Sequence, residues 1–155
     1  MTHETVSSML RAMVVKKKVL FVCIGNSCRS QMAEALARHH ARDVIEPASA
    51  GISPLGSIMQ GTLNALRLRG IPAEGQYSKG LGEAIRFQPD LIVNMSGVTG
   101  KSLFPRADVV DWKVPDPYGE DVETYLRICD DIESRVKKLA EQFRTKHRKR
   151  PSEAN

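Results

Sequence analysis

The feature that most constrains the fold of this chain is a short apolar run that leads through a glycine-containing loop into a helical pattern. Val19-Leu20-Phe21-Val22 combines β-branched and aromatic residues, which is typical of a buried strand. The loop that follows reads Cys-Ile-Gly-Asn-Ser-Cys-Arg-Ser, and helical spacing begins at once with Met32 and Leu36 on one side. A strand, a short loop and a helix in this order predict the opening of a βαβ unit.

The rest of the chain alternates in the same way. Residues 44–51, 90–95 (DLIVNM) and 107–110 favour further strands, and Leu63 and Leu66 indicate a helix that stops near Gly70. A long terminal helix is indicated by apolar residues at helical spacing, namely Val122, Leu126, Cys129, Ile132, Val136, Leu139 and Phe143. We therefore expect an α/β fold: a single domain with a four-stranded parallel sheet and helices on both faces.

The length of 155 residues suits one domain, with no linker or internal repeat to divide it. We expect the catalytic domain to span residues 16–147. Residues 1–15 then form an N-terminal extension and residues 148–155 a basic C-terminal tail, and both ends are expected to be poorly ordered.

The composition excludes several classes of protein. A hydrophobic fraction of 41% without a long apolar run predicts no membrane span, and the N-terminus does not resemble a secretory signal. Three cysteines, an odd number, argue against a disulfide-framed secreted protein and favour the cytoplasm. The net charge of +5 is concentrated in residues 16–18 and 146–150, where no aromatic residue is interleaved, so we expect no nucleic-acid partner.

The loop after the first strand is the candidate functional site, because ligands of open parallel sheets bind beyond the carboxyl ends of the strands. A loop that turns into a helix N-terminus presents several backbone N–H groups to an anion. Gly25 and Asn26 tolerate the positive φ values that such a loop requires. We expect the oxyanion to be bound by Ile24, Gly25, Asn26, Ser27, Cys28, Arg29 and Ser30.

Two residues of this segment and one aspartate far along the chain point to nucleophilic chemistry. The positive field that binds a phosphate also favours the thiolate of Cys23, and Arg29 carries a planar set of donors that matches two phosphate oxygens. Asp116, followed by a proline that disfavours helix, is the best candidate for a general acid on an exposed loop. Asp108 and Asp111 compete for that role.

These motifs resemble a known superfamily. VLFVCIGNSCRSQMAEALA is similar to the phosphate loop and first helix of low-molecular-weight protein tyrosine phosphatases and of the related thioredoxin-coupled arsenate reductases. The likeness continues in Ser49-Ala50-Gly51, in DLIVNM and in residues 114–119, and it spans residues 18–143.

The resemblance implies a role for each matching residue. Cys23 matches the nucleophile, Arg29 the oxyanion clamp and Asp116 the general acid. Asn26 matches the residue that holds the shape of the loop, and Ser30 the hydroxyl that stabilises the leaving thiolate. No cofactor and no metal ion are implied.

The resemblance implies a phosphatase of the protein-tyrosine-phosphatase type that forms a cysteinyl-phosphate. Its partners are a phosphorylated protein or a small phosphomonoester, with inorganic phosphate or arsenate as a ligand. The alternative is an arsenate reductase that takes its second thiol from an external donor. A binding protein that kept the anion site and lost turnover is a third hypothesis, disfavoured because nucleophile, clamp and acid are all present.

Three departures from the family bear on this choice. Gln31 stands where the phosphatases usually have proline. In this respect the sequence resembles the reductases. The phosphatases surround the substrate ring with aromatic residues. Here one wall carries Leu55 and no aromatic residue, and the other carries only Tyr118, because Gly119 replaces a second tyrosine. The reductases have a redox cysteine after the third strand, whereas the corresponding stretch here, residues 93–97, contains no cysteine.

The remaining cysteines and the four histidines lie outside the proposed catalytic group. Cys129 lies on the apolar stripe of the last helix, which favours a buried structural residue. Cys28 either packs within the loop or condenses with an oxidised Cys23 and protects it. None of the four histidines has cysteine or carboxylate partners at ligand spacing, so no metal site is expected.

Overall fold

The computed structural model describes residues 16–153, with side chains placed as far as Lys146. The expected N-terminal extension and the last two residues of the expected C-terminal tail lie outside this range.

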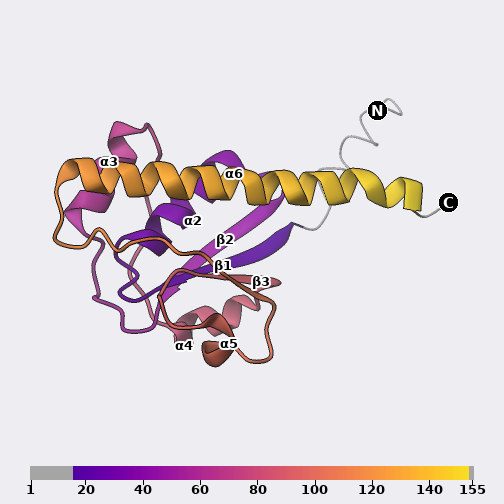
Figure 1. Cartoon of the computed structure of the whole chain (residues 1–155), viewed down its shortest axis with the longest axis horizontal. Helices are drawn as coiled ribbons and strands as arrows, with labels where there is room; N and C mark the ends of the chain where they lie inside the picture. Colours follow the sequence, from indigo (N-terminus) through magenta and orange to yellow (C-terminus); the bar gives the residue numbers. More distant parts are fainter. Residues whose placement is uncertain (1–15, 154–155) are drawn as a thin grey trace.

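Four strands form one parallel sheet in the order β2-β1-β3-β4 (Figure 1). Their bounds are Lys17–Cys23 for β1, Ile45–Gly51 for β2, Leu91–Asn94 for β3 and Val109–Asp111 for β4. Each coincides with a strand expected from the apolar runs, to within a few residues. The prediction of a single α/β domain with a four-stranded parallel sheet is confirmed.

Within residues 16–153, six helical segments connect and cover these strands. They are α2 (Arg29–His40), α3 (Gln60–Leu68), α4 (Leu81–Ala84), η1 (Ile85–Phe87), α5 (Gly100–Leu103) and α6 (Val122–Glu153). The sequence did not indicate α4, η1 or α5, because one turn of helix is too short to show a periodic pattern. Helix α6 includes residues 148–153, so this part of the expected poorly ordered tail instead continues the helix.

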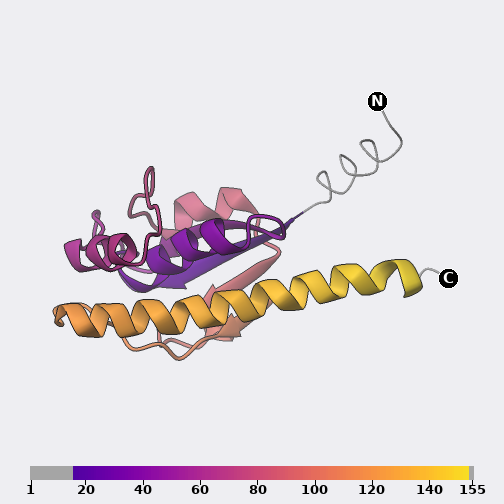
Figure 2. The same ribbon diagram turned by 90° about the horizontal axis from the view of Figure 1, so that it is seen from above.

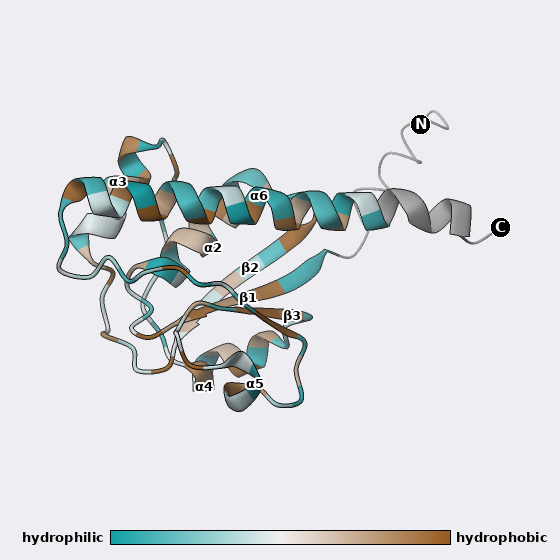
Figure 3. Cartoon of the chain, viewed as in Figure 1, coloured by the Kyte–Doolittle hydropathy of each residue, from teal (hydrophilic) through white to brown (hydrophobic). Residues whose placement is uncertain are grey.

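The side chains of β1 explain why helices lie on both faces of the sheet. Val19 and Phe21 point into a core formed with α2, α3 and α6, whereas Leu20 and Val22 point into a smaller core beneath α4 and η1. This alternation follows from the two-residue period of a strand. Figure 2 shows α6 running along the length of the domain, and Figure 3 shows apolar colour concentrated on β1 and β3. Burial of each large apolar side chain stabilises the fold by about 1.5–3 kcal/mol.

The register of the strands brings the candidate residues to one edge. Cys23 at the end of β1 pairs with Gly51 at the end of β2, and Asn94 at the end of β3 pairs with Asp111 at the end of β4. The loops that follow β1, β3 and β4 therefore leave the sheet on the same side.

Candidate active site

The loop between β1 and α2 is curved so that its carbonyl groups face surrounding segments. Five consecutive carbonyls, from Cys23 to Ser27, accept hydrogen bonds from outside the loop itself. The donors are the backbone N–H groups of Ile52, Ser53, Leu55 and Met59 and the side chains of Ser78, Gln31 and Thr62. A loop with outward carbonyls turns its N–H groups inward, which is the backbone arrangement of an anion-binding nest.

Small residues permit this curvature for two different reasons. Asn26 has a φ of +48°, as expected for a residue that tolerates the left-handed region. The same expectation for Gly25 is wrong, since it is not among the residues with positive φ. A Cβ atom at Gly25 would instead lie 3.0 Å from the Cγ of Leu55, so the Leu55 side chain would have to shift to make room for it. A Cβ atom at Gly51 would lie 2.6 Å from the carbonyl oxygen of Ile24, so β2 packs directly against the loop.

The thiol of Cys23 lies buried at the start of the loop. Its Sγ atom is 2.8 Å from the hydroxyl of Ser30 in the first turn of α2. Ser30 in turn accepts a hydrogen bond of 2.7 Å from the side-chain amide of Asn26. No side chain caps the N-terminus of α2 and no acidic residue lies in its first turn, so the helix dipole acts on the loop without a local counter-charge.

The guanidinium of Arg29 is held by backbone groups from the neighbouring loops. Its Nη1 donates to the carbonyl oxygens of Met95, at 2.6 Å, and Val114, at 3.1 Å. Its Nη2 lies 3.5 Å from a carboxylate oxygen of Asp116. Its Nε is buried and, within the described part of the chain, has no hydrogen-bond partner, which also holds for the hydroxyl of Ser27.

Of the three aspartates considered as general acids, the structure brings Asp116 to the loop. Asp116 is about half exposed and accepts a hydrogen bond from the backbone N–H of Tyr118. Asp111 is occupied elsewhere, since its Oδ1 accepts from the side chain of Asn94 at 2.8 Å and from the N–H of Gly100 at 3.0 Å. Asp111 therefore ties the loop after β3 to β4.

The residues expected to form the substrate walls are both exposed, Leu55 after β2 and Tyr118 beside Asp116. Ile24 in the loop adds a third apolar side chain at the surface. Gly119, which replaces the second tyrosine, has a φ of +78°, a conformation that side chains rarely adopt.

Cys28 and Cys129 are buried free thiols. Burial raises the pKa of the Cys28 thiol, whose sulfur lies 3.6 Å from the hydroxyl of Tyr125. Burial likewise raises the pKa of Cys129 to about 11. Both thiols are therefore protonated at neutral pH, and neither is a ready nucleophile in this conformation.

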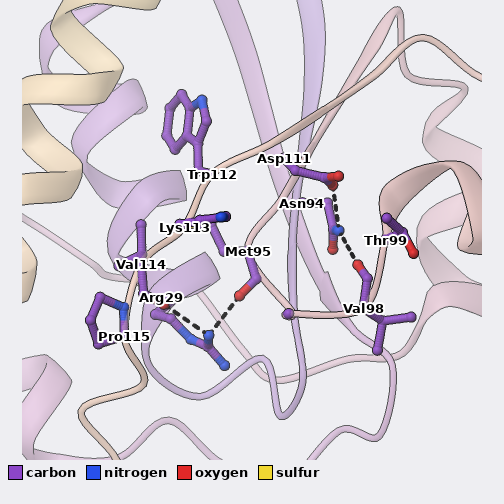
Figure 4. A pocket seen from close by; sticks show the side chains of 11 residues that line it. Arg29, Asn94, Met95, Val98, Thr99, Asp111, Trp112, Lys113, Val114 and Pro115 are labelled. Carbon is purple, nitrogen blue, oxygen red and sulfur yellow. Dashed lines mark hydrogen bonds between the residues drawn. The ribbon is translucent and has the colours of Figure 1, made fainter.

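A pocket of about 430 Å³ lies beside the guanidinium of Arg29, where β3 and β4 end (Figure 4). Its walls are mostly the loops after these strands, and Figure 4 shows Asp111, Asn94 and Val98 on one side and Trp112 and Lys113 on another. Among the described residues, no cluster of three or more His, Cys, Asp or Glu could hold a metal ion, and no helix is long and apolar enough to cross a membrane.

The sequence did not reveal the segment that supports the loop from outside. In residues 76–79, Gln76, Tyr77 and Lys79 contact Asn26 or Gln31, and the hydroxyl of Ser78 donates to the carbonyl oxygen of Gly25. Nothing in Gln76-Tyr77-Ser78-Lys79 resembles a motif, and only the unusual Gln31 could have drawn attention to this contact.

Comparison with known proteins agrees with this geometry. Residues 18–149 match the family model described as low molecular weight phosphotyrosine protein phosphatase. An arsenate reductase from Bacillus cereus is 34% identical over 129 residues, covering 81% of this chain and 96% of the relative. An arsenate reductase from Brevibacillus brevis is 35% identical over 130 residues, covering 81% of this chain and 96% of that relative.

Similar proteins of known structure are named for the same two activities. The YwlE arginine phosphatase from Geobacillus stearothermophilus aligns with a TM-score of 0.74 and 28% identity over 84% of this chain and 94% of its own. An arsenate reductase in a phosphate-binding state aligns with a TM-score of 0.73 and 28% identity over 82% of this chain and 98% of its own.

Proposed function

The chain belongs to the low molecular weight phosphotyrosine protein phosphatase family, and on this basis we propose that it is a phosphatase that hydrolyses phosphomonoesters through a cysteinyl-phosphate. The observation that carries the proposal is the meeting of Cys23, Arg29 and Asp116 at one loop. Ser30 lies against the thiol, Arg29 faces Asp116, and no second nucleophilic thiol is presented by the described residues. Family members are named both as phosphatases and as arsenate reductases, so the choice depends on this site.

The proposed reaction has two steps. The Cys23 thiolate attacks phosphorus, the bond to the leaving oxygen breaks, and Asp116 gives that oxygen its proton. The Asp116 carboxylate then takes a proton from water, which attacks the cysteinyl-phosphate and releases inorganic phosphate and the thiolate. Arg29 and the inward N–H groups bind the equatorial oxygens while charge shifts between them.

The unpaired polar atoms of the loop support this proposal. The Nε of Arg29 and the hydroxyl of Ser27 are buried among groups that do not bond them. Buried donors without a partner are costly. A bound oxyanion satisfies the Arg29 Nε and adds a partner to the inward N–H groups.

The test is hydrolysis of a generic aryl phosphate between acidic and neutral pH, with chelator present. We expect turnover by the wild type and none by Cys23→Ser, which keeps the loop but lacks the thiolate. Equal inertness of the two proteins would refute the proposal.

A second candidate function is arsenate reduction with an external thiol donor. It is favoured by the arsenate reductases at 34% and 35% identity. Arsenate matches phosphate in charge and nearly in shape, but a Cys23–arsenate adduct needs another sulfur to complete a two-electron reduction. Arsenite production with glutathione, mycothiol or a small dithiol protein tests it, and no product with any of them rejects it.

A hydrolysis assay also distinguishes which class of phosphorylated side chain the enzyme prefers. A wall of Leu55, Ile24 and a single tyrosine gives a phenol ring less aromatic contact than two tyrosines do, and one structural neighbour is named an arginine phosphatase. Peptides carrying phosphotyrosine and phosphoarginine, compared by kcat/KM, separate these substrates. The free cysteines suit a reducing compartment, and we propose that the enzyme acts in the cytoplasm.

A further inference from the structure

Gln31 is a completely buried amide that contacts the phosphate loop and the 76–79 segment at once. Its Nε2 donates to the Oδ1 of Asn26 at 2.9 Å, to the backbone oxygen of Asn26 at 3.1 Å and to the carbonyl oxygen of Tyr77 at 2.9 Å. Its Oε1 accepts a hydrogen bond of 2.7 Å from the side-chain amide of Gln76. Every polar atom of the side chain therefore has a partner.

The direction of these hydrogen bonds is set from the surface by Arg38. A guanidinium can only donate, and the Nη1 of Arg38 donates to the Oε1 of Gln76 at 2.8 Å. Gln76 must then present its NH₂ group to Gln31. Gln31 in turn presents its NH₂ group to Asn26. Arg38 is itself held by an ion pair of 2.7 Å with the buried carboxylate of Glu34, so the first donor is fixed in place.

A second donor acts on the same oxygen of Asn26 as Gln31 does. The backbone N–H of Lys79, which cannot be reversed, donates to the Oδ1 of Asn26 at 2.9 Å. The NH₂ group of Asn26 must therefore face the hydroxyl of Ser30, 2.7 Å away. With its oxygen accepting from Asn26, the hydroxyl of Ser30 has its single hydrogen left for the sulfur of Cys23, at 2.8 Å.

We propose that Gln31 and Gln76 are positioning residues, forming a one-way chain of hydrogen bonds that acts with the backbone N–H of Lys79 to make the hydroxyl of Ser30 donate to Cys23. A hydrogen bond donated to an anionic acceptor is stronger than one between neutral groups, and successive bonds in a chain polarise one another. The chain thus favours the thiolate of Cys23. This inference rests on the proposed function only in taking Cys23 as the reacting group, and the phosphatase and the alternative reductase share that group.

The sharpest test replaces one atom of the chain. In Gln76→Glu the carboxylate still accepts from Arg38 but has no hydrogen to donate to the Oε1 of Gln31, so the chain is broken at this link. Gln76 is partly exposed, which lets the variant fold. Gln142→Glu makes the same change of charge on the exposed surface of α6 and is the matched control.

The measurement is the rate of Cys23 alkylation by iodoacetamide as a function of pH, without any substrate. Loss of one hydrogen bond between neutral groups, such as the one from Gln76 to Gln31, corresponds to roughly a three- to tenfold effect. We therefore expect Gln76→Glu to be alkylated about three- to tenfold more slowly near neutral pH, with its profile displaced to higher pH. The charged groups nearest the loop and the chain, namely Arg29, Asp116, Glu34, Arg38 and Lys79, are retained in every variant.

A second variant removes the chain at its centre. Gln31→Met keeps the buried volume and has no hydrogen-bond donor, so we expect the same displacement. If both variants fold and their alkylation profiles match the wild type, the proposal is wrong; if Gln31→Met fails to fold, Gln76→Glu decides alone. An equal displacement in Gln142→Glu also overturns it, because the cause is then general charge. Since no turnover is measured, the outcome is separate from success or failure of the proposed phosphatase.

Discussion

Asp116 and Arg29, which are far apart in sequence, meet at the phosphate loop with a carboxylate oxygen 3.5 Å from Nη2 of the guanidinium. Arg29 is buried and held by two carbonyl groups, whereas Asp116 is about half exposed on the loop after β4. The candidate acid therefore lies beside the group that would bind the oxyanion, within reach of a leaving oxygen.

Asp116→Asn should lower turnover far more than it weakens substrate binding, because the acid acts mainly in the transition state. General acid catalysis typically contributes about 10²–10⁴-fold. We expect a loss in that range for alkyl phosphates and a smaller loss for esters with good leaving groups, which need little protonation. Steady-state kcat and KM for a series of leaving groups measure this.

Asp111→Asn is the matched control for that experiment. Asp111 binds Asn94 and the N–H of Gly100, so its loss should reduce stability more than it changes the dependence on the leaving group. A neutral Asp116→Asn together with a crippling Asp111→Asn would mean that the acid is misassigned.

Gly51→Ala should disrupt the phosphate loop. The new methyl group would lie 2.6 Å from the carbonyl oxygen of Ile24 and 2.7 Å from the backbone nitrogen of Asn26, and neither backbone group can move without deforming the loop. Overpacking of this kind typically costs about 1–3 kcal/mol of stability. We also expect inorganic phosphate to bind more weakly, as measured by calorimetry.

Gly82→Ala is the control, since a Cβ atom there meets nothing within 4 Å in helix α4. It should leave phosphate binding unchanged and stability equal or slightly higher. Wild-type phosphate affinity in Gly51→Ala would show that β2 does not shape the loop.

Mild peroxide should inactivate the enzyme, phosphate should protect it and a thiol reductant should restore it. The raised pKa of Cys28 means that little of its thiolate exists at neutral pH. Any bond between Cys28 and an oxidised Cys23 should therefore form faster as pH rises from about 7 to 9. Cys28→Ser should recover less completely, because the sulfenic acid goes on to irreversible states.

Mass spectrometry of the peptide from Leu20 to Arg29 detects this bond. Cys129→Ala is the control, since its thiol is buried in α6 and should affect neither inactivation nor recovery. Equal recovery of Cys28→Ser and wild type, with no Cys23–Cys28 bond, would assign Cys28 to packing alone.

The ion pair between Asp43 and Arg144 should stabilise the fold in a pH-dependent way. The hydrogen bonds from Arg144, both 2.8 Å, lower the pKa of Asp43 below its ordinary value of 3.8. A carboxylate with a lowered pKa contributes stability above the ordinary value, and this contribution is lost as pH falls through the lowered value. Both side chains are partly exposed, so we expect only roughly 0.2–1 kcal/mol.

Thermal unfolding of Asp43→Asn and wild type checks this pair. The difference in Tm should be present at pH 7 and should shrink below about pH 4. A difference that stays constant down to pH 2 would show that the effect is not electrostatic.

Local patterns in the sequence were sufficient to predict the four strands, the helix after the loop and the long terminal helix. A short apolar run is enough to predict a buried strand. Val19-Leu20-Phe21-Val22 is buried on both faces of the sheet, as its composition indicates. The residues expected at the loop, from Ile24 to Ser30, form the curved segment that the motif suggested. Short helices such as α4 and α5 were missed because they carry no period.

Only the tertiary structure decided which distant groups act on the loop. The sequence favoured Asp116 over Asp111 as the acid, but it is packing that brings the first to Arg29 and commits the second to Asn94. The φ of Gly25 is not positive, and the close neighbour of this glycine is Leu55, which folding brings from the segment after β2. The chain of amides through Gln31 and Gln76 exists because folding places residue 76 against residue 31, and hydrogen-bond direction depends on such three-dimensional contacts, which no local pattern encodes.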